Sequence, residues 1–210
     1  AALAERMLRY QNIRWASLVD WESQGQGMLI ATRFADTAQL HLVRRPGGAR
    51  RQLTFYKDRI SGGALRPGAA ELVFLKDSGG DENFQLYRQG LGEERPTLLT
   101  DGRSRWENPR WSQDGLKLVF TGTARNGKDF DFWALDLAKS TAPALVLPRE
   151  GQWQPEDWSP DGSKLLILKY VSINETYPYL WDLAKATAAP LFPGQEGRRV
   201  AYGALAFSEG

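Results

Sequence analysis

Few side chains in this sequence have the types and spacing that chemistry requires. The single histidine, His41, is the one imidazole available as a general base. Paired carboxylates at Asp81–Glu82 and Glu93–Glu94 have the composition of an acid–base couple. The run "DSGGDEN" at 77–83 carries oxygen ligands of the kind that bind calcium. Each candidate has to be judged by the element that carries it.

None of these candidates has the sequence surroundings that its chemistry needs. His41 lies within "AQLHLV", with no serine or carboxylate set nearby, and we interpret it as a packed or surface-facing strand residue. The carboxylate pairs are interpreted as exposed loop charges, and 77–83 lacks the spacing of a calcium loop. The chain has no cysteine, no G-x-S-x-G elbow and no glycine-rich phosphate loop opening onto a helix. We therefore expect no catalytic residue, no metal and no cofactor here.

Composition and charge restrict the partners of the chain. The 210 residues carry a formal net charge of +2, which gives no electrostatic case for nucleic acid or an acidic membrane surface. No apolar run approaches the roughly 18 residues of a membrane span. With 42% hydrophobic and 25% charged residues, we expect a soluble globular protein. The sequence leaves its compartment open between cytoplasm and periplasm.

The elements that must position any site are set by an internal repeat. "WSQDGLKLVF" at 111–120 recurs as "WSPDGSKLLI" at 158–167, and aligning on the turn gives five registers. Their large apolar anchors are Trp21, Leu65, Trp111, Trp158 and Phe207, spaced by 44, 46, 47 and 49 residues. Each period contains four short runs rich in β-branched and aromatic residues, separated by Gly, Pro, Asp and Asn. A period in the mid-forties is that of a four-stranded propeller blade.

The turn and the tryptophans add detail to each repeat. Gly115 and Gly162 are expected to supply the positive φ that closes the hairpin. The pairs Trp106–Trp111 and Trp153–Trp158 are each five residues apart on a predicted innermost strand. An odd spacing predicts rings on opposite faces of that strand, where neighbouring blades bury both. We interpret all four rings as core.

The sequence therefore predicts an all-β fold, a β-propeller of four-stranded antiparallel blades. Residues 1–11 are expected to form a linker or short helix, and 12–210 a partial propeller. The predicted boundaries are 12–55, 58–100, 104–148 and 152–193 for four blades and 199–207 for the first strand of a fifth.

Four stretches resemble the N-terminal propeller of the prolyl oligopeptidase family of serine peptidases, which includes dipeptidyl-peptidase-like and acylaminoacyl-peptidase-like enzymes. They are "TRFADTAQLHLVRRPGGARRQLTF" (32–55), "GGDENFQLYRQG" (79–90), "LLTDGRSRWENPRWSQDG" (98–115) and "YVSINETY" (170–177). The resemblance implies a propeller of typically seven blades that gates peptide access to a C-terminal α/β-hydrolase domain with a Ser-Asp-His triad. The sequence ends within its fifth turn motif, so we expect a segment of a larger protein whose triad lies outside it.

Function on such a ring is expected in the loops between the second and third strands, because rigid strands position them. Our hypothesis is that one or more of Glu82, Asn83, Asn174 and Glu175 contacts the peptide substrate or the hydrolase domain. The alternative is that they are ordinary polar turn residues.

A second interpretation of the whole chain is a TolB-type propeller that binds proteins and has no enzyme attached. With either function, a partial ring leaves blade faces uncovered, so we expect the isolated segment to self-associate or to be poorly stable.

Overall fold

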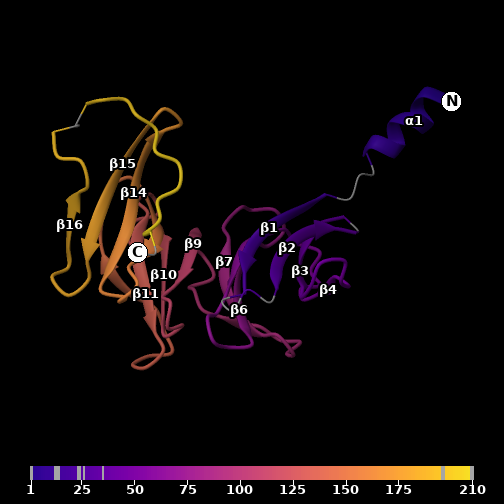
Figure 1. Cartoon of the computed structure of the whole chain (residues 1–210), viewed down its shortest axis with the longest axis horizontal. Coiled ribbons are helices and arrows are strands. Elements are labelled where there is room, and N and C mark those ends of the chain that lie inside the picture. Colours follow the sequence, from indigo (N-terminus) through magenta and orange to yellow (C-terminus); the bar gives the residue numbers. More distant parts are fainter. Residues whose placement is uncertain are drawn as a thin grey trace.

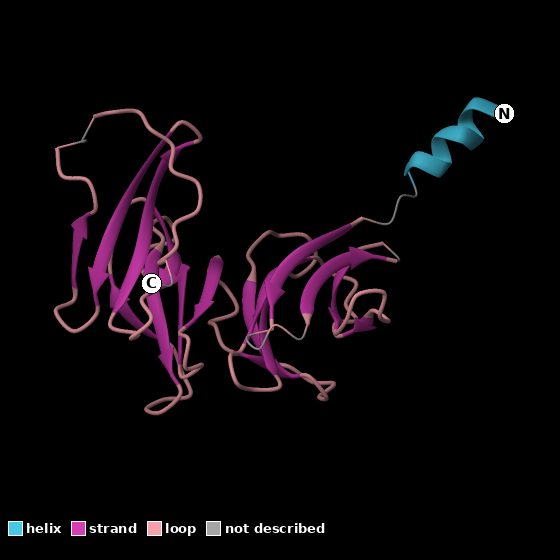
Figure 2. Ribbon diagram, in the orientation of Figure 1, coloured by secondary structure: helices cyan, strands magenta, loops and turns pink. Residues whose placement is uncertain are grey.

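The computed structural model describes residues 2–11, 15–22, 25, 27–34, 36–194 and 197–208. Within these residues, sixteen strands form four separate four-stranded antiparallel sheets, each made of four strands consecutive in sequence (Figures 1 and 2). Blade 1 comprises β1 (Ala16–Trp21), β2 (Met28–Arg33), β3 (Ala38–Val43) and β4 (Arg51–Gln52). Blade 2 comprises β5 (Ile60–Leu65), β6 (Glu71–Lys76), β7 (Gln85–Gly90) and β8 (Thr97–Leu98). Blade 3 comprises β9 (Trp106–Trp111), β10 (Lys117–Gly122), β11 (Asp131–Asp136) and β12 (Ala144–Leu147). Blade 4 comprises β13 (Gln152–Trp158), β14 (Lys164–Ser172), β15 (Glu175–Asp182) and β16 (Thr187–Pro190).

The first strand of each blade is the innermost. β1 contacts β5, β5 contacts β9, and β9 contacts β13, whereas the fourth strands contact no strand of another blade within the described part of the chain. The hydrophobic core lies between the blades as three clusters, one for each pair of successive blades. The centres of these clusters are fully buried side chains such as Phe74, Phe120 and Phe132. The blades are therefore held by burial of apolar surface against each other rather than by shared strand pairing.

The turn that recurs in blades 3 and 4 is held by serine, aspartate and glycine. In blade 3 the Ser112 hydroxyl donates to Asp114 Oδ1 at 2.5 Å and accepts the Lys117 amide at 2.9 Å. Ser159, Asp161 and Lys164 repeat these bonds in blade 4. Gly115 and Gly162 have φ of +66° and +65°, as the sequence predicts.

The four tryptophans are core residues, but their faces differ from the sequence prediction. Trp106, Trp111, Trp153 and Trp158 are between 2% and 8% exposed. Trp106 pairs with Gly122 and Trp111 with Leu118, so both rings lie on one face of blade 3. The prediction of opposite faces is wrong because a β-bulge at Asn108–Pro109 inserts an extra residue and shifts the alternation. Blade 4 has a bulge at the corresponding place.

The two ends of the row of blades differ. The anchors Leu65, Trp111 and Trp158 face the preceding blade, whereas the anchor Trp21 of blade 1 is 56% exposed, because no blade among the described residues precedes it. In blade 4 the outward residues Leu166 and Leu168 are buried.

Residues 197–208 run along blade 4. The Phe207 amide donates to Asp157 Oδ2 at 2.8 Å, just as the Leu65 amide donates to Asp20 Oδ2 at 2.7 Å between blades 1 and 2. The predicted strand 199–207 is nevertheless not a strand, because no second strand of a fifth blade pairs with it in the described chain. That this segment is the inner edge of a further blade remains our proposal.

At the other terminus, α1 (Ala2–Gln11) forms where the sequence left a linker or a short helix open. It projects away from the sheets and contacts no described strand (Figure 2). No helix in the described part of the chain is long and apolar enough to cross a membrane.

Candidate functional site

The predicted pair in blade 2 lies in the connection between β6 and β7. Glu82 is exposed and has a φ of +59°, an uncommon conformation for a residue with a side chain. Asn83 is also exposed, and its amide donates to Asp81 Oδ1 at 3.0 Å in a local turn. The Asp81–Asn83 hydrogen bond closes a local turn, and Glu82 lies within that turn in its positive-φ conformation.

The predicted pair in blade 4 lies at the β14–β15 hairpin. Asn174 is exposed at its tip, next to Ile173, which is 81% exposed. Glu175 is half-buried, and its Oε1 accepts a 2.5 Å hydrogen bond from the Tyr177 hydroxyl. This bond to the carboxylate raises the pKa of Tyr177. Among the described residues, no hydrogen bond or ion pair joins the blade 2 pair to the blade 4 pair.

The loops are fixed to the backbone by a repeated buried polar residue that sequence reasoning missed. Near the start of the third strand of each blade lies a polar side chain that bonds the segment leading to the next blade; these are Gln39, Gln85, Asp131 and Thr176. All four are at most 7% exposed. Their spacing of 46, 46 and 45 residues is the repeat period, and it was the available signal. The connections therefore share one face with the blade-joining segments, which we call the linker face.

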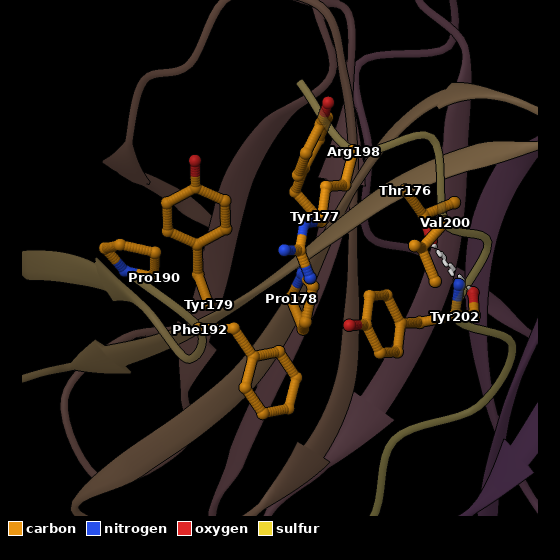
Figure 3. A pocket seen from close by; sticks show the side chains of 9 residues that line it. All are labelled: Thr176, Tyr177, Pro178, Tyr179, Pro190, Phe192, Arg198, Val200 and Tyr202. Carbon is orange, nitrogen blue, oxygen red and sulfur yellow. Dashed lines mark hydrogen bonds between the residues drawn. The ribbon is translucent and has the colours of Figure 1, made fainter. Parts of the chain in front are cut away.

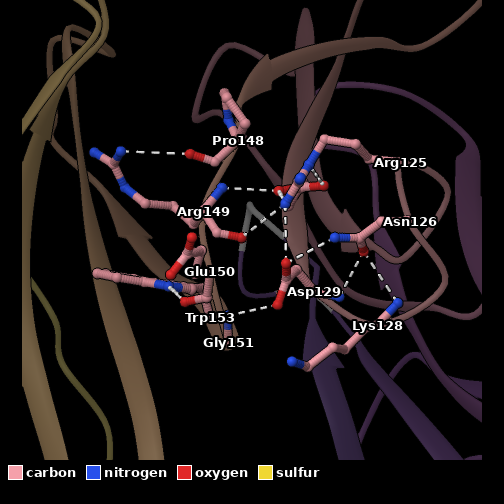
Figure 4. A network of polar contacts seen from close by, with 10 residues as sticks. Arg125, Asn126, Lys128, Asp129, Pro148, Arg149, Glu150, Gly151 and Trp153 are labelled. Carbon is pink, nitrogen blue, oxygen red and sulfur yellow. Dashed lines mark hydrogen bonds and ion pairs between the residues drawn. The ribbon is translucent and has the colours of Figure 1, made fainter.

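Blade 3 shows the most elaborate of these contacts (Figure 4). Arg125 forms two hydrogen bonds to Asp131, at 2.7 and 3.0 Å, and one to Asp129 at 3.2 Å. The carboxylates also accept backbone amides of the β12–β13 segment, from Arg149 at 2.7 Å and Gly151 at 2.9 Å. The Gly151 amide, followed by the Asn126 side chain, lowers the pKa of Asp129. Each oxygen of Asp129 and Asp131 accepts at least one hydrogen bond from within the blade or its linker, so the network has a structural role.

A polar cavity lies along the innermost strands, where the ring axis of a propeller would be. Its two lobes, of about 360 and 270 Å³, share Val19, Gly63, Pro109 and Arg110 from β1, β5 and β9. Bulges in all four innermost strands interrupt the regular alternation and re-aim side chains along this wall.

Asp20 and Arg110 are the charged residues that line the first lobe. Burial raises the pKa of Asp20, and the amides of Leu65 and Trp21 and the charge of Arg110 partly oppose this. Arg110 donates to the backbone carbonyls of Glu156 and Pro109, each at 3.2 Å. The cavity can therefore exchange hydrogen bonds with a polar backbone, such as that of a peptide.

Among the described residues, the fold does not bring His41 together with carboxylates in a catalytic or metal-binding group. His41 is 2% exposed, with Nδ1 3.0 Å from its own strand's Gln39 carbonyl and its ring 5.3 Å from that of Phe34. Burial lowers the pKa of this imidazole. In the described part of the chain no three His, Cys, Asp or Glu side chains are grouped to hold a metal.

A further hollow lies where the 197–202 segment covers β15 and β16 (Figure 3). Tyr177, Tyr179, Phe192 and Tyr202 line it, and the rings of Phe192 and Tyr202 stack at 5.5 Å. Its volume of about 20 Å³ admits one water molecule, so it is a packing gap rather than a ligand site.

Comparison with solved structures identifies the architecture. TolB from Acinetobacter baumannii superposes with a TM-score of 0.69 at 16% identity, covering 86% of this chain and 44% of TolB. A prolyl endopeptidase superposes with a TM-score of 0.67 at 14% identity, covering 86% of this chain and 30% of the enzyme. A puromycin-hydrolysing peptidase of Mycobacterium tuberculosis gives 0.61 at 13% identity, covering 86% and 28%. This chain has a β-propeller fold.

The likeness extends to the fold alone. No protein-family model matches the chain, and no curated protein matches its sequence. The chain spans less than half the length of TolB and less than a third of the prolyl endopeptidase. TolB and the prolyl endopeptidase are structural matches of nearly equal quality, at TM-scores of 0.69 and 0.67.

Proposed function

We propose that this chain is the propeller portion of a serine peptidase of the prolyl oligopeptidase family, where it gates and positions peptide substrates. Catalysis would belong to a C-terminal α/β-hydrolase domain of the same polypeptide. The observation that carries this proposal is the polar cavity along the innermost strands, lined by Asp20 and Arg110. The sequence resemblance at 79–90 and 170–177 and the structural likeness to a prolyl endopeptidase support it.

Within this function, Glu82, Asn83, Asn174 and Glu175 are proposed to contact the peptide or the hydrolase domain. Three of them are exposed on the linker face, on connections fixed by Gln85 and Thr176. Acidic side chains there suit the ammonium group of a peptide's free N-terminus. Glu175 would exchange its Tyr177 hydrogen bond for that ammonium.

The test uses the full-length protein. We expect a G-x-S-x-G elbow downstream of Gly210 and covalent labelling by a fluorophosphonate, which reacts with activated serines. Glu82→Ala and Glu175→Ala should lower kcat/KM for peptides with a free N-terminus more than for N-acetylated ones, with Asp136→Ala as the control. Unchanged kcat/KM for every peptide would refute the site, while failure of labelling would refute the peptidase.

The second candidate is a TolB-type scaffold that binds proteins without catalysis. The specific observation in its favour is the TM-score of 0.69 with TolB, at least as high as that with the peptidases. It predicts a reading frame that stops after the last blade and a full-length protein that no fluorophosphonate labels.

A further inference from the structure

Gln89 breaks the pattern of the repeat at a buried position. On the third strand, the residue opposite the second-strand partner of the anchor is Val43 in blade 1, Leu135 in blade 3 and Trp181 in blade 4. In blade 2 the partner of Leu72 is Gln89. All four are at most 8% exposed. Blade 2 thus buries an amide where the other blades bury hydrocarbon, at a cost in stability.

The Gln89 amide is only half satisfied. Its Nε2 donates to the Glu93 carbonyl at 2.6 Å and to the Leu53 carbonyl of blade 1 at 3.4 Å. Its Oε1 is buried and has no hydrogen-bond donor in the described structure. A buried acceptor without a donor is rare in native proteins, and a residue that violates local rules commonly marks a functional site.

Gln89 lines a cavity of about 330 Å³ between the outer parts of blades 1 and 2. This volume is at the lower end of the range for ligand pockets. The blade 1 wall is Leu53, Phe55 and Tyr56, and the blade 2 wall is Gln89 with the exposed pair Glu93–Glu94. The Phe55 ring is 76% exposed beside the cavity, so it is open to contact by a ligand.

The groups around this cavity select a positively charged ligand. The carboxylates of Glu93 and Glu94 and the Gln89 Oε1 only accept hydrogen bonds. Glu93 Oε2 accepts one amide, from Gly90 at 3.2 Å, and has capacity for more. The nearby Arg51 guanidinium already donates to the Leu91 carbonyl at 3.2 Å. An aromatic face beside two carboxylates matches a planar guanidinium, which stacks on rings and pairs with carboxylates in a bidentate way.

We propose that this inter-blade pocket binds an arginine side chain of a basic peptide segment. The guanidinium stacks on Phe55 and pairs with Glu93 and Glu94. A shift of the Gln89 side chain on binding then brings its buried, unpaired Oε1 to the guanidinium as an acceptor. This site is independent of the cavity along the innermost strands and of any hydrolase domain.

The test is a titration of the ¹⁵N-labelled chain with the peptide acetyl-Gly-Arg-Gly-amide, followed by NMR. We expect saturable shifts of the Gln89 side-chain amide resonances, weaker shifts with the lysine peptide and none with the citrulline peptide, which is isosteric with arginine but uncharged. The double change Glu93→Gln/Glu94→Gln should weaken binding by about tenfold or more. Asp136→Asn, in the corresponding hairpin of blade 3, should not affect it.

Gln89→Leu supplies the second arm, because it restores the residue type of the other blades. We expect weaker peptide binding and an equal or higher melting temperature. Equal binding of the citrulline peptide, unchanged binding by the double glutamine variant, or no saturable shift would each overturn the proposal. If Gln89→Leu has a lower melting temperature, its weaker binding is not counted, and the binding affinity of Glu93→Gln/Glu94→Gln alone decides whether the proposal stands.

Discussion

Gly115 and Gly162 have the same turn conformation but different surroundings. A Cβ added at Gly115 would lie 2.4 Å from the Pro67 carbonyl oxygen, whereas one at Gly162 would meet nothing within 4 Å. Gly162→Ala should therefore cost only the strain of positive φ, roughly 1–2 kcal/mol. Gly115→Ala should cost about 1–3 kcal/mol more, because the preceding blade must move. Urea unfolding of the two variants measures the difference, and equal losses would contradict it.

Asp101 gives the stability a pH dependence. Burial opposes ionisation, but hydrogen bonds from Ser104, the Arg103 amide and the Trp106 indole lower the pKa of Asp101 to about 2. Because this pKa lies below the unfolded value of 3.8, the contribution is complete above about pH 5 and is lost as pH falls toward 2. The stability difference between wild type and Asp101→Asn should shrink over that window. A difference that stays constant from pH 6 to 2.5 in urea unfolding would refute the assignment.

The conformation or burial of a single residue could be predicted where only one residue type suits the position. The turn glycines and the tryptophan anchors were predicted because only glycine adopts positive φ cheaply and large rings require burial. Gln85 and Asp131 were not predicted as buried, since polar residues are usually exposed and their backbone partners come from a different segment. Glu82 and Glu175 were expected in loops. Glu82 lies in the β6–β7 connection, whereas Glu175 is the first residue of β15 and accepts a hydrogen bond from Tyr177.

At the scale of elements, the innermost strands show what periodicity cannot predict. The five-residue spacing of Trp153 and Trp158 indicated opposite faces, yet these residues pair with Lys169 and Leu165, four positions apart on β14. The bulge near Glu156 places both rings on one face, and no residue type reliably predicts a bulge. Strands, turns and blade order follow from local composition, whereas the face of a ring depends on one inserted residue.

Tryptophans at equivalent positions in different blades are expected to contribute unequally to the free energy of unfolding. Trp158 is 2% exposed between blades 3 and 4, so Trp158→Ala should cost about 3–5 kcal/mol of unfolding free energy. Trp21 occupies the same register but is 56% exposed, so Trp21→Ala should change it by no more than about 0.5 kcal/mol. Guanidinium unfolding of the 210-residue chain followed by circular dichroism compares them. Similar losses would mean that another surface covers Trp21.

At the scale of the whole molecule, the uncovered face of blade 1 determines how the isolated chain behaves. Trp15, Leu18 and Trp21 are 44%, 52% and 56% exposed on one strand and its approach, while the far face of blade 4 is covered by 197–208. An apolar face of this kind associates in water. We expect the chain to form dimers or larger species through blade 1, and sedimentation velocity over a concentration series measures this.

The variants identify which face associates. Leu18→Glu/Trp21→Glu places two charges on the blade 1 face and should restore a monomer at the same concentration, because burying them costs more than association gains. Phe192→Glu, near the other end of the row, should leave the assembly unchanged. A wild-type chain that remains monomeric at all concentrations, with a sharp cooperative melt, would show that four blades are self-sufficient. The propeller would then not need a further blade against Trp21 to be stable.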